Sequence, residues 1–136
     1  MHIHKTKEKP RSLGDYAKAW SLFSFLKRKG GKKMEKLVHK RGTTLYVRIP
    51  KEVDHCVTEE LREFLDRKVQ TENIKVIEFD FQNTEFMDSS GIGFLMGRFK
   101  LMRALGGTVH IINAGERIRK VLMLSGIHKI IPMEGI

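Results

Sequence analysis

Two hydroxyl side chains and a carboxylate stand together in the segment Phe86-Met87-Asp88-Ser89-Ser90-Gly91-Ile92-Gly93. A serine beside a carboxylate can cap a helix, act as a nucleophile or accept a phosphoryl group. In residues 76–81, which precede the segment, apolar and polar side chains alternate, and β-branched and aromatic side chains are frequent. Apolar residues follow at helical spacing: Ile92, Leu95, Met96, Phe99 and Met102. We therefore expect both serines at a strand–loop–helix junction, among free backbone N–H groups.

Such a junction can carry a phosphate. A phosphoryl group adds about −1.5 to −2 charges, and a helix N-terminus accepts that charge without unfolding of the domain. The alternative is that Ser89 or Ser90 only caps the helix, a common role of serine. Asp88 is a poor candidate for a general base toward Ser89, because neighbouring side chains in a capping turn point in different directions.

Motifs of catalysis and cofactor binding are absent from the sequence. It contains no Gly-x-x-x-x-Gly-Lys-Ser/Thr loop, no Cys-x-x-Cys, no His-Glu-x-x-His and no Gly-x-Ser-x-Gly. Glycines 91, 93 and 97 fall at the start of the expected helix or inside it, where they allow close approach of backbone or partner. Histidines 39, 110 and 128 show no ligand spacing. We therefore expect neither an enzyme nor a cofactor nor a metal site.

The first elements that must position the serines follow from hydrophobic periodicity. Residues 37–40 and 44–49 flank Arg41-Gly42 and predict a β-hairpin. A helix capped by Thr58 is expected next, with a buried stripe of Leu61, Phe64, Leu65 and Val69. The strand of residues 76–81 follows, and then the helix that begins near Ser89.

The C-terminal third continues the alternation of helix and strand. Gly106-Gly107 ends the serine helix, and residues 108–112 read as a strand. A shorter helix then ends at Gly126 and carries Ile118, Val121, Leu122 and Leu124. We expect a last strand over residues 127–131, before Pro132. The resulting order β-β-α-β-α-β-α-β predicts an α/β fold with helices packed on a mixed sheet.

Composition limits the protein to one small domain. Its 136 residues, 40% of them hydrophobic, can build a modest core, and no apolar run approaches the length of a membrane span. The single cysteine, Cys56, excludes an internal disulfide, and no secretory signal is recognisable. We therefore expect a cytoplasmic protein.

The formal charge of +10 is concentrated at the N-terminus. Residues 1–33 hold ten Lys or Arg against two acidic residues, whereas residues 34–136 hold sixteen against fourteen. Because the second part is nearly neutral, we expect no direct binding of nucleic acid, which would rest on residues 1–33 alone.

Residues 1–33 are polar and basic and cannot bury a core. Lys29-Gly30-Gly31 is what a purine-rich ribosome-binding sequence would encode in frame just before Met34. We interpret residues 1–33 as a disordered leader or an artefact of a start site assigned too early, and residues 34–136 as the domain. The alternative is a basic amphipathic helix for a membrane surface or partner, built on Tyr16, Ala19, Trp20, Phe23 and Leu26. We favour the first interpretation and expect no membrane attachment.

Three stretches, in order along the chain, together resemble one known family. The first stretch comprises residues 52–55 and the following Thr58-Glu59-Glu60-Leu61. The second comprises residues 86–93 with Gly97-Arg98-Phe99-Lys100 and Gly106-Gly107. The third comprises residues 124–131. They resemble the STAS-domain anti-sigma factor antagonists, and most closely the sporulation type that acts on an anti-sigma-F factor. The resemblance spans nearly everything from Met34 onward.

This resemblance implies the STAS fold and a partner-switching function. The antagonist would bind an anti-sigma serine kinase, release the sigma factor, and be switched off by phosphorylation. Ser89 is implied as the phosphoacceptor because it directly follows the aspartate. The implied partner-binding residues are Asp54, Asp88, Ser90, Gly91, Ile92 and Gly93. The kinase would bring ATP and magnesium, and a phosphatase acting on phosphoserine would reset the protein.

Two departures from the family pattern and two further functions stay open. Lys51 occupies the place of a usual glycine, which predicts an altered choice among kinases. The helix that family members usually carry after the last strand has no counterpart in residues 133–136.

A general-stress antagonist of the same fold and a scaffold module that is never phosphorylated are the alternative functions.

Overall fold

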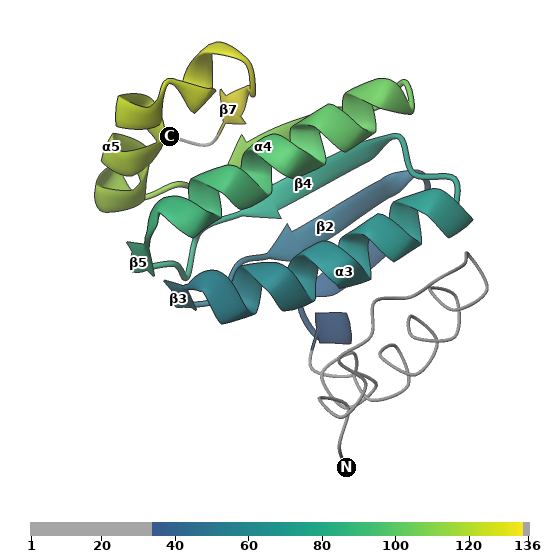
Figure 1. Ribbon diagram of the computed structural model, residues 1–136, viewed down its shortest axis with the longest axis horizontal. Helices are drawn as coiled ribbons and strands as arrows, with labels where there is room; N and C mark the ends of the chain where they lie inside the picture. The colour runs from purple at the N-terminus through teal and green to yellow at the C-terminus, as the bar shows by residue number, and fades with distance from the viewer. Residues whose placement is uncertain (1–33, 135–136) are drawn as a thin grey trace, which may run out of the picture.

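A five-stranded mixed sheet forms the framework of the computed structural model, which describes residues 34–134 (Figure 1). The strand order is β1-β2-β4-β6-β7; β1 and β2 form the predicted antiparallel hairpin, and the other neighbours pair in parallel. The strands are β1 (Val38–Arg41), β2 (Thr44–Arg48), β4 (Val76–Asp80), β6 (Thr108–Ile112) and β7 (Met133–Glu134). The expectation of a mixed sheet with packed helices is confirmed.

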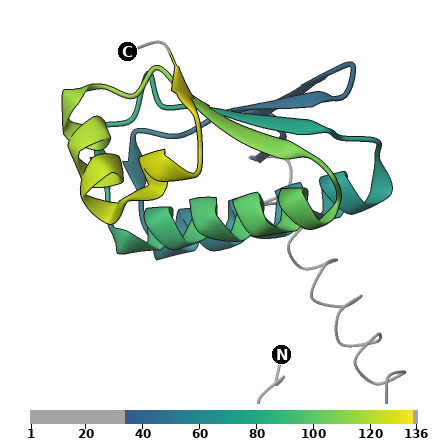
Figure 2. The ribbon, with the colours of Figure 1, turned by 90° about the horizontal axis from the view of Figure 1, so that it is seen from above.

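Two long helices, α3 (His55–Thr71) and α4 (Ser89–Ala104), lie side by side on the same face of this sheet (Figure 2). The shorter α5 (Glu116–Ser125) and the 3-10 helix η2 (Ile127–Lys129) follow β6, and α5 contacts β5. Among the helices within residues 34–134, none has the length and apolarity needed to cross a bilayer.

A second, two-stranded sheet was not predicted from the sequence. Strands β3 (Glu52–Val53) and β5 (Phe86–Met87) pair in parallel, with Val53 opposite Met87. Each strand directly precedes a long helix, so this pairing fixes the starts of α3 and α4 next to each other. Two-residue strands carry no periodic signal, which explains why sequence patterns miss them.

The core lies between the main sheet and the two long helices. Alternate residues of β2, β4 and β6 point inward and are fully buried, as the period of two in a strand requires: Leu45, Val47, Ile77, Phe79, Val109 and Ile111. They meet the buried stripes of the helices, which include Leu61 and Leu65 on α3 and Leu95 and Met102 on α4. This packing holds α3 and α4, and hence their N-terminal ends, in fixed positions.

The predicted last strand over residues 127–131 is wrong. Ile127–Lys129 form a 3-10 helix, and the strand β7 begins only after Pro132, whose carbonyl accepts a hydrogen bond from the Ile111 N–H at 2.9 Å. Ile127 and Ile131 are both buried, and the Ile131 N–H donates to the Ile127 carbonyl at 2.9 Å. A spacing of four suits a helical turn as well as the same face of a strand, so burial alone could not separate the two.

The interpretations that concern residues 1–33, including the amphipathic helix around Trp20, lie outside the described residues.

Candidate phosphoacceptor and partner-binding site

The N-terminal ends of α3 and α4 form one continuous surface. The β3–β5 pairing places Asp54 and Asp88, which follow Val53 and Met87, next to each other at the helix starts (Figure 1). The Asp88 N–H donates to the Val53 carbonyl at 3.3 Å. Two helix termini with their positive dipole ends therefore meet at this edge of the molecule.

Asp54 is the N-cap of α3. Its backbone is extended, and its Oδ1 accepts a hydrogen bond from the Val57 N–H at 2.9 Å. The predicted cap, Thr58, is wrong: this residue is buried inside the helix, and its hydroxyl donates to the His55 carbonyl at 2.9 Å. Aspartate and threonine both cap helices well, so residue type alone does not decide between Asp54 and Thr58.

Asp88 is the N-cap of α4. Its Oδ1 accepts hydrogen bonds from the Ser90 N–H at 2.9 Å and from the Ser90 hydroxyl in a short contact. The hydrogen bond from the Ser90 hydroxyl lowers the pKa of Asp88, and backbone N–H groups and the charge of His55 act in the same direction. The cap is therefore an ionised carboxylate, and neither serine is the cap residue itself.

Ser89 differs from Ser90 in what its hydroxyl contacts. Ser89 is the first residue of α4 and is exposed, and within residues 34–134 its hydroxyl forms no hydrogen bond. The Ser90 hydroxyl is half-buried and held by Asp88. An incoming group therefore meets a free hydroxyl at Ser89 and an engaged one at Ser90.

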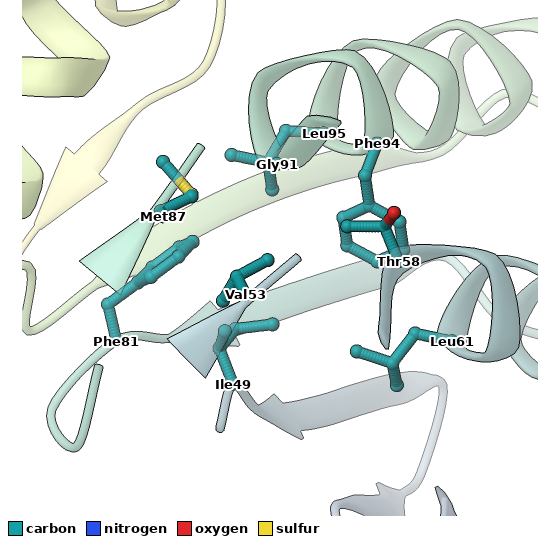
Figure 3. A pocket seen from close by; sticks show the side chains of 9 residues that line it. All are labelled: Ile49, Val53, Thr58, Leu61, Phe81, Met87, Gly91, Phe94 and Leu95. Atoms are coloured by element: carbon teal, nitrogen blue, oxygen red, sulfur yellow. The ribbon is translucent and has the colours of Figure 1, made fainter. Parts of the chain in front are cut away.

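Gly91 lies beneath the surface and lets α4 approach β5. A Cβ at this position would collide with the Met87 side chain, 2.5 Å from its Sδ, and would lie 3.5 Å from Val53 Cγ1. Figure 3 shows Gly91 facing Met87 and Val53 in an apolar seam that leaves no room for a water molecule. The seam joins the small sheet to both long helices and carries the starts of α3 and α4.

A groove lies between α3 and α4. Its volume is about 260 Å³, and it is lined by His55, Thr58, Glu59 and Arg62 of α3 and by Ser90, Gly93, Phe94, Gly97 and Arg98 of α4. Ser90 belongs both to this groove and to the capped helix start. The groove therefore continues directly from the Ser89 surface.

Arg98 ties the two helices together beside the groove. Its side chain is 7% exposed, its Nε lies 2.8 Å from Asp66 Oδ1, and its guanidinium lies 5.5 Å from the centre of the Phe94 ring. Burial lowers the pKa of Arg98 and raises that of Asp66, and the opposite charge of the partner counteracts each shift. Sequence reasoning missed this tie. The spacing of Gly91, Leu95, Arg98 and Met102 could have revealed an arginine on the buried stripe of α4.

The structure thus brings together the residues expected at the site. Asp54, Asp88, Ser89, Ser90 and Gly93 are exposed or half-buried around the two helix starts, Ile92 is half-buried, and Gly91 is buried below them. Contact of these residues with a partner stays a prediction. In the part of the chain from Met34 to Glu134, no three His, Cys, Asp or Glu side chains are grouped so that they could hold a metal ion.

Comparison with known proteins gives consistent matches. The sequence model of the STAS domain matches residues 35–135. An anti-sigma F factor antagonist from Paenibacillus polymyxa is 35% identical over 95 residues, which cover 70% of this chain and 80% of the relative.

Two solved structures of the anti-sigma factor antagonist SpoIIAA share this fold. The unphosphorylated form is 26% identical with a TM-score of 0.66, over 71% of this chain and 85% of that chain. The phosphorylated form, described as a Bacillus cell fate determinant, is 26% identical with a TM-score of 0.61, over 71% and 88% of the two chains.

Proposed function

Because this chain belongs to the STAS-domain family, alongside anti-sigma factor antagonists, we propose that it binds an anti-sigma serine kinase and so releases a sigma factor. Phosphorylation of Ser89 ends the binding, and a phosphatase acting on phosphoserine restores it. The kinase supplies ATP and magnesium, while this chain supplies the acceptor hydroxyl and a docking surface. The exchange takes place in the cytoplasm, where sigma factors meet RNA polymerase.

The observation that carries the proposal is the difference between the two serines. Ser89 is exposed at the first turn of α4, and no group within residues 34–134 engages its hydroxyl. The Ser90 hydroxyl is bound to Asp88, so phosphorylation there would first break the cap of α4. A kinase therefore reaches Ser89 at a lower cost. The SpoIIAA structures in phosphorylated and unphosphorylated form support a switch of this kind in the family.

Charge explains how one phosphate changes the choice of partner. A phosphoryl group brings about −1.5 to −2 charges to a surface that already holds the carboxylates of Asp54 and Asp88. The helix N-termini accept the phosphate, so the fold survives. A partner that docks on this surface meets repulsion, an added desolvation cost and added bulk. Each loss of about 1.4 kcal/mol weakens binding tenfold, so two or three such penalties suffice.

The test is peptide mass spectrometry after incubation with the anti-sigma kinase of the same organism and MgATP. We expect one phosphoryl group on Ser89 in the wild type and in Ser90→Ala, and none in Ser89→Ala. Transfer to Ser90, or no transfer by a kinase that phosphorylates its own antagonist, would contradict the proposal. A panel of kinases separates the sporulation function from a general-stress function, which differs only in the partner. Repeating the panel with Lys51→Gly tests whether this residue sets the choice.

We further propose that the functional domain comprises residues 34–136 and that residues 1–33 are a leader outside it or the result of a start site assigned too early. Two observations support this boundary: the family match begins at residue 35, and Met34 is buried in the core. N-terminal sequencing of the protein from native cells tests it. A first residue upstream of Met34 would contradict a start site assigned too early.

A further inference from the structure

The groove between α3 and α4 exists because α4 carries glycines where the fold does not need them. Gly93 and Gly97 lie one helical turn apart, and a Cβ at either position would meet nothing within 4 Å. A glycine inside a helix is less favourable than alanine. This contrasts with Gly91, whose missing Cβ is required by Met87. The fold therefore gives no packing reason for either glycine.

A buried cation lies beside this open space. Arg98 lines the groove, yet its side chain is 7% exposed, and its Nη1 has no hydrogen-bond partner within residues 34–134. Asp66 approaches only the Nε, at 2.8 Å, without the alignment of a hydrogen bond. A buried donor without a partner carries an uncompensated desolvation cost. An acceptor that reached this guanidinium would recover that cost.

We propose that the groove receives an acidic side chain of the anti-sigma kinase, whose carboxylate binds Arg98 while its backbone packs against Gly93 and Gly97. The proposal rests on the function proposed above and adds the chemistry of the partner. The charged residues of the groove are two arginines, Arg62 and Arg98, against one acid, Glu59, so an anion complements them. Glu59 already binds Arg62, at 3.0 and 3.1 Å, whereas Asp66 approaches Arg98 only at its Nε and leaves the Nη1 for the incoming group.

The size of the groove fits such an occupant. Its volume of about 260 Å³ compares with the roughly 30 Å³ that one water occupies in the liquid, which leaves room for a carboxylate side chain and adjoining backbone. Arg98 Nη1 is covered in the unbound protein. Binding therefore requires the guanidinium to turn toward the groove, where its planar fork of donors suits a carboxylate.

The same arrangement explains the direction of the switch. Ser90 lines the groove, and Ser89 is the residue directly before it at the start of α4. A phosphate on Ser89 therefore lies on the path of the entering carboxylate, and the two anions repel each other. Binding of the acidic side chain and phosphorylation become mutually exclusive.

The first part of the experiment fills the groove without disturbing the core. Gly97→Ala adds a methyl group in open space, so we expect an unchanged or higher melting temperature together with at least a tenfold loss of affinity for the kinase. Affinity is measured by titration calorimetry of the unphosphorylated chain without ATP. The matched control is Gly115→Ser at the start of α5, another position with open space, where we expect unchanged affinity.

The second part identifies the acidic residue. Each surface Asp or Glu of the kinase is changed to its amide and tested against the wild type and against Arg98→Lys, which keeps the charge but loses the planar fork. One amide variant of the kinase is expected to bind the wild-type chain tenfold more weakly than the unchanged kinase does. The same variant should bind Arg98→Lys about as well as the unchanged kinase binds Arg98→Lys.

The outcomes separate the two proposals. If wild type and Gly97→Ala bind equally and Ser89 is still phosphorylated, the groove proposal is overturned and the proposed function stands. If Gly97→Ala binds weakly but no acidic residue couples to Arg98, the acidic chemistry is overturned. If the wild type neither binds the kinase nor accepts phosphate, the proposed function itself fails.

Discussion

The sharpest structural prediction concerns two alanine substitutions on one helix, Gly91→Ala and Gly93→Ala. A Cβ at Gly91 would lie 2.5 Å from Met87 Sδ and closer still to Met87 Cγ, whereas a Cβ at Gly93 would meet nothing within 4 Å. Met87 is 5% exposed and packed in the seam of Figure 3, so it cannot simply move into solvent. The same chemical change should therefore have opposite effects two residues apart.

The magnitudes follow from packing and helix propensity. An extra methyl group in a well-packed interior costs about 1–3 kcal/mol, while alanine is about 1 kcal/mol better than glycine in a helix. We expect a net loss of about 1–2 kcal/mol for Gly91→Ala and a gain of up to about 1 kcal/mol for Gly93→Ala. The free energies of unfolding of the two variants should thus differ by about 2–3 kcal/mol.

Urea unfolding followed by circular dichroism measures this difference. The double variant Gly91→Ala with Met87→Ala provides the mechanism test, because removal of the Met87 side chain should abolish the penalty of the alanine. Equal stability of Gly91→Ala and Gly93→Ala would refute the close approach of α4 to β5. An undiminished penalty in the Met87→Ala background would refute its assignment to Met87.

Three further predictions concern the polar ties of the site. Arg98→Met should lower the free energy of unfolding by about 3 kcal/mol, because it leaves Asp66 partly buried without its cation, and adding Asp66→Leu should restore most of the loss. Equal urea midpoints of the single and the double variant would contradict a stabilising ion pair between Arg98 and Asp66. The Ser90 hydroxyl lowers the pKa of Asp88, so the stability that the ionised carboxylate contributes is present above about pH 3.9, the usual aspartate pKa, and is lost as the pH falls through the lower folded pKa. The free energy of unfolding of the wild type should therefore exceed that of Asp88→Asn by less on acidification. A difference that does not change with pH would speak against this linkage. Asp54→Ala should cost about 1 kcal/mol by loss of the α3 cap, and an unchanged urea midpoint would show that another residue caps the helix.

Elements with a clear period were predictable from the sequence. The strand Thr44–Arg48 of the hairpin and the strand Thr108–Ile112 match their predictions closely, because buried positions alternate with less buried ones along each of them. The errors arose where two principles gave equal signals. Asp54 and Thr58 are both good caps, and the spacing of Ile127 and Ile131 suits a helical turn as well as a strand.

The site could be located from the sequence, but its internal contacts could not. The position of Ser89 and Ser90 at a strand–helix junction follows from periodicity and is observed. Which hydroxyl is free depends on the geometry of the Asp88 cap, which no pattern encodes. The pairing of β3 with β5, the clash at Gly91 and the burial of Arg98 likewise depend on contacts between distant segments.

We propose that one phosphate on Ser89 decides whether the anti-sigma kinase binds this chain. The most direct measurement is the dissociation constant of the kinase for two preparations of this chain, unmodified and phosphorylated on Ser89, under identical conditions without ATP. We predict that phosphorylation weakens binding by at least tenfold and that dephosphorylation restores it fully. Equal affinity of the two preparations would contradict the claim.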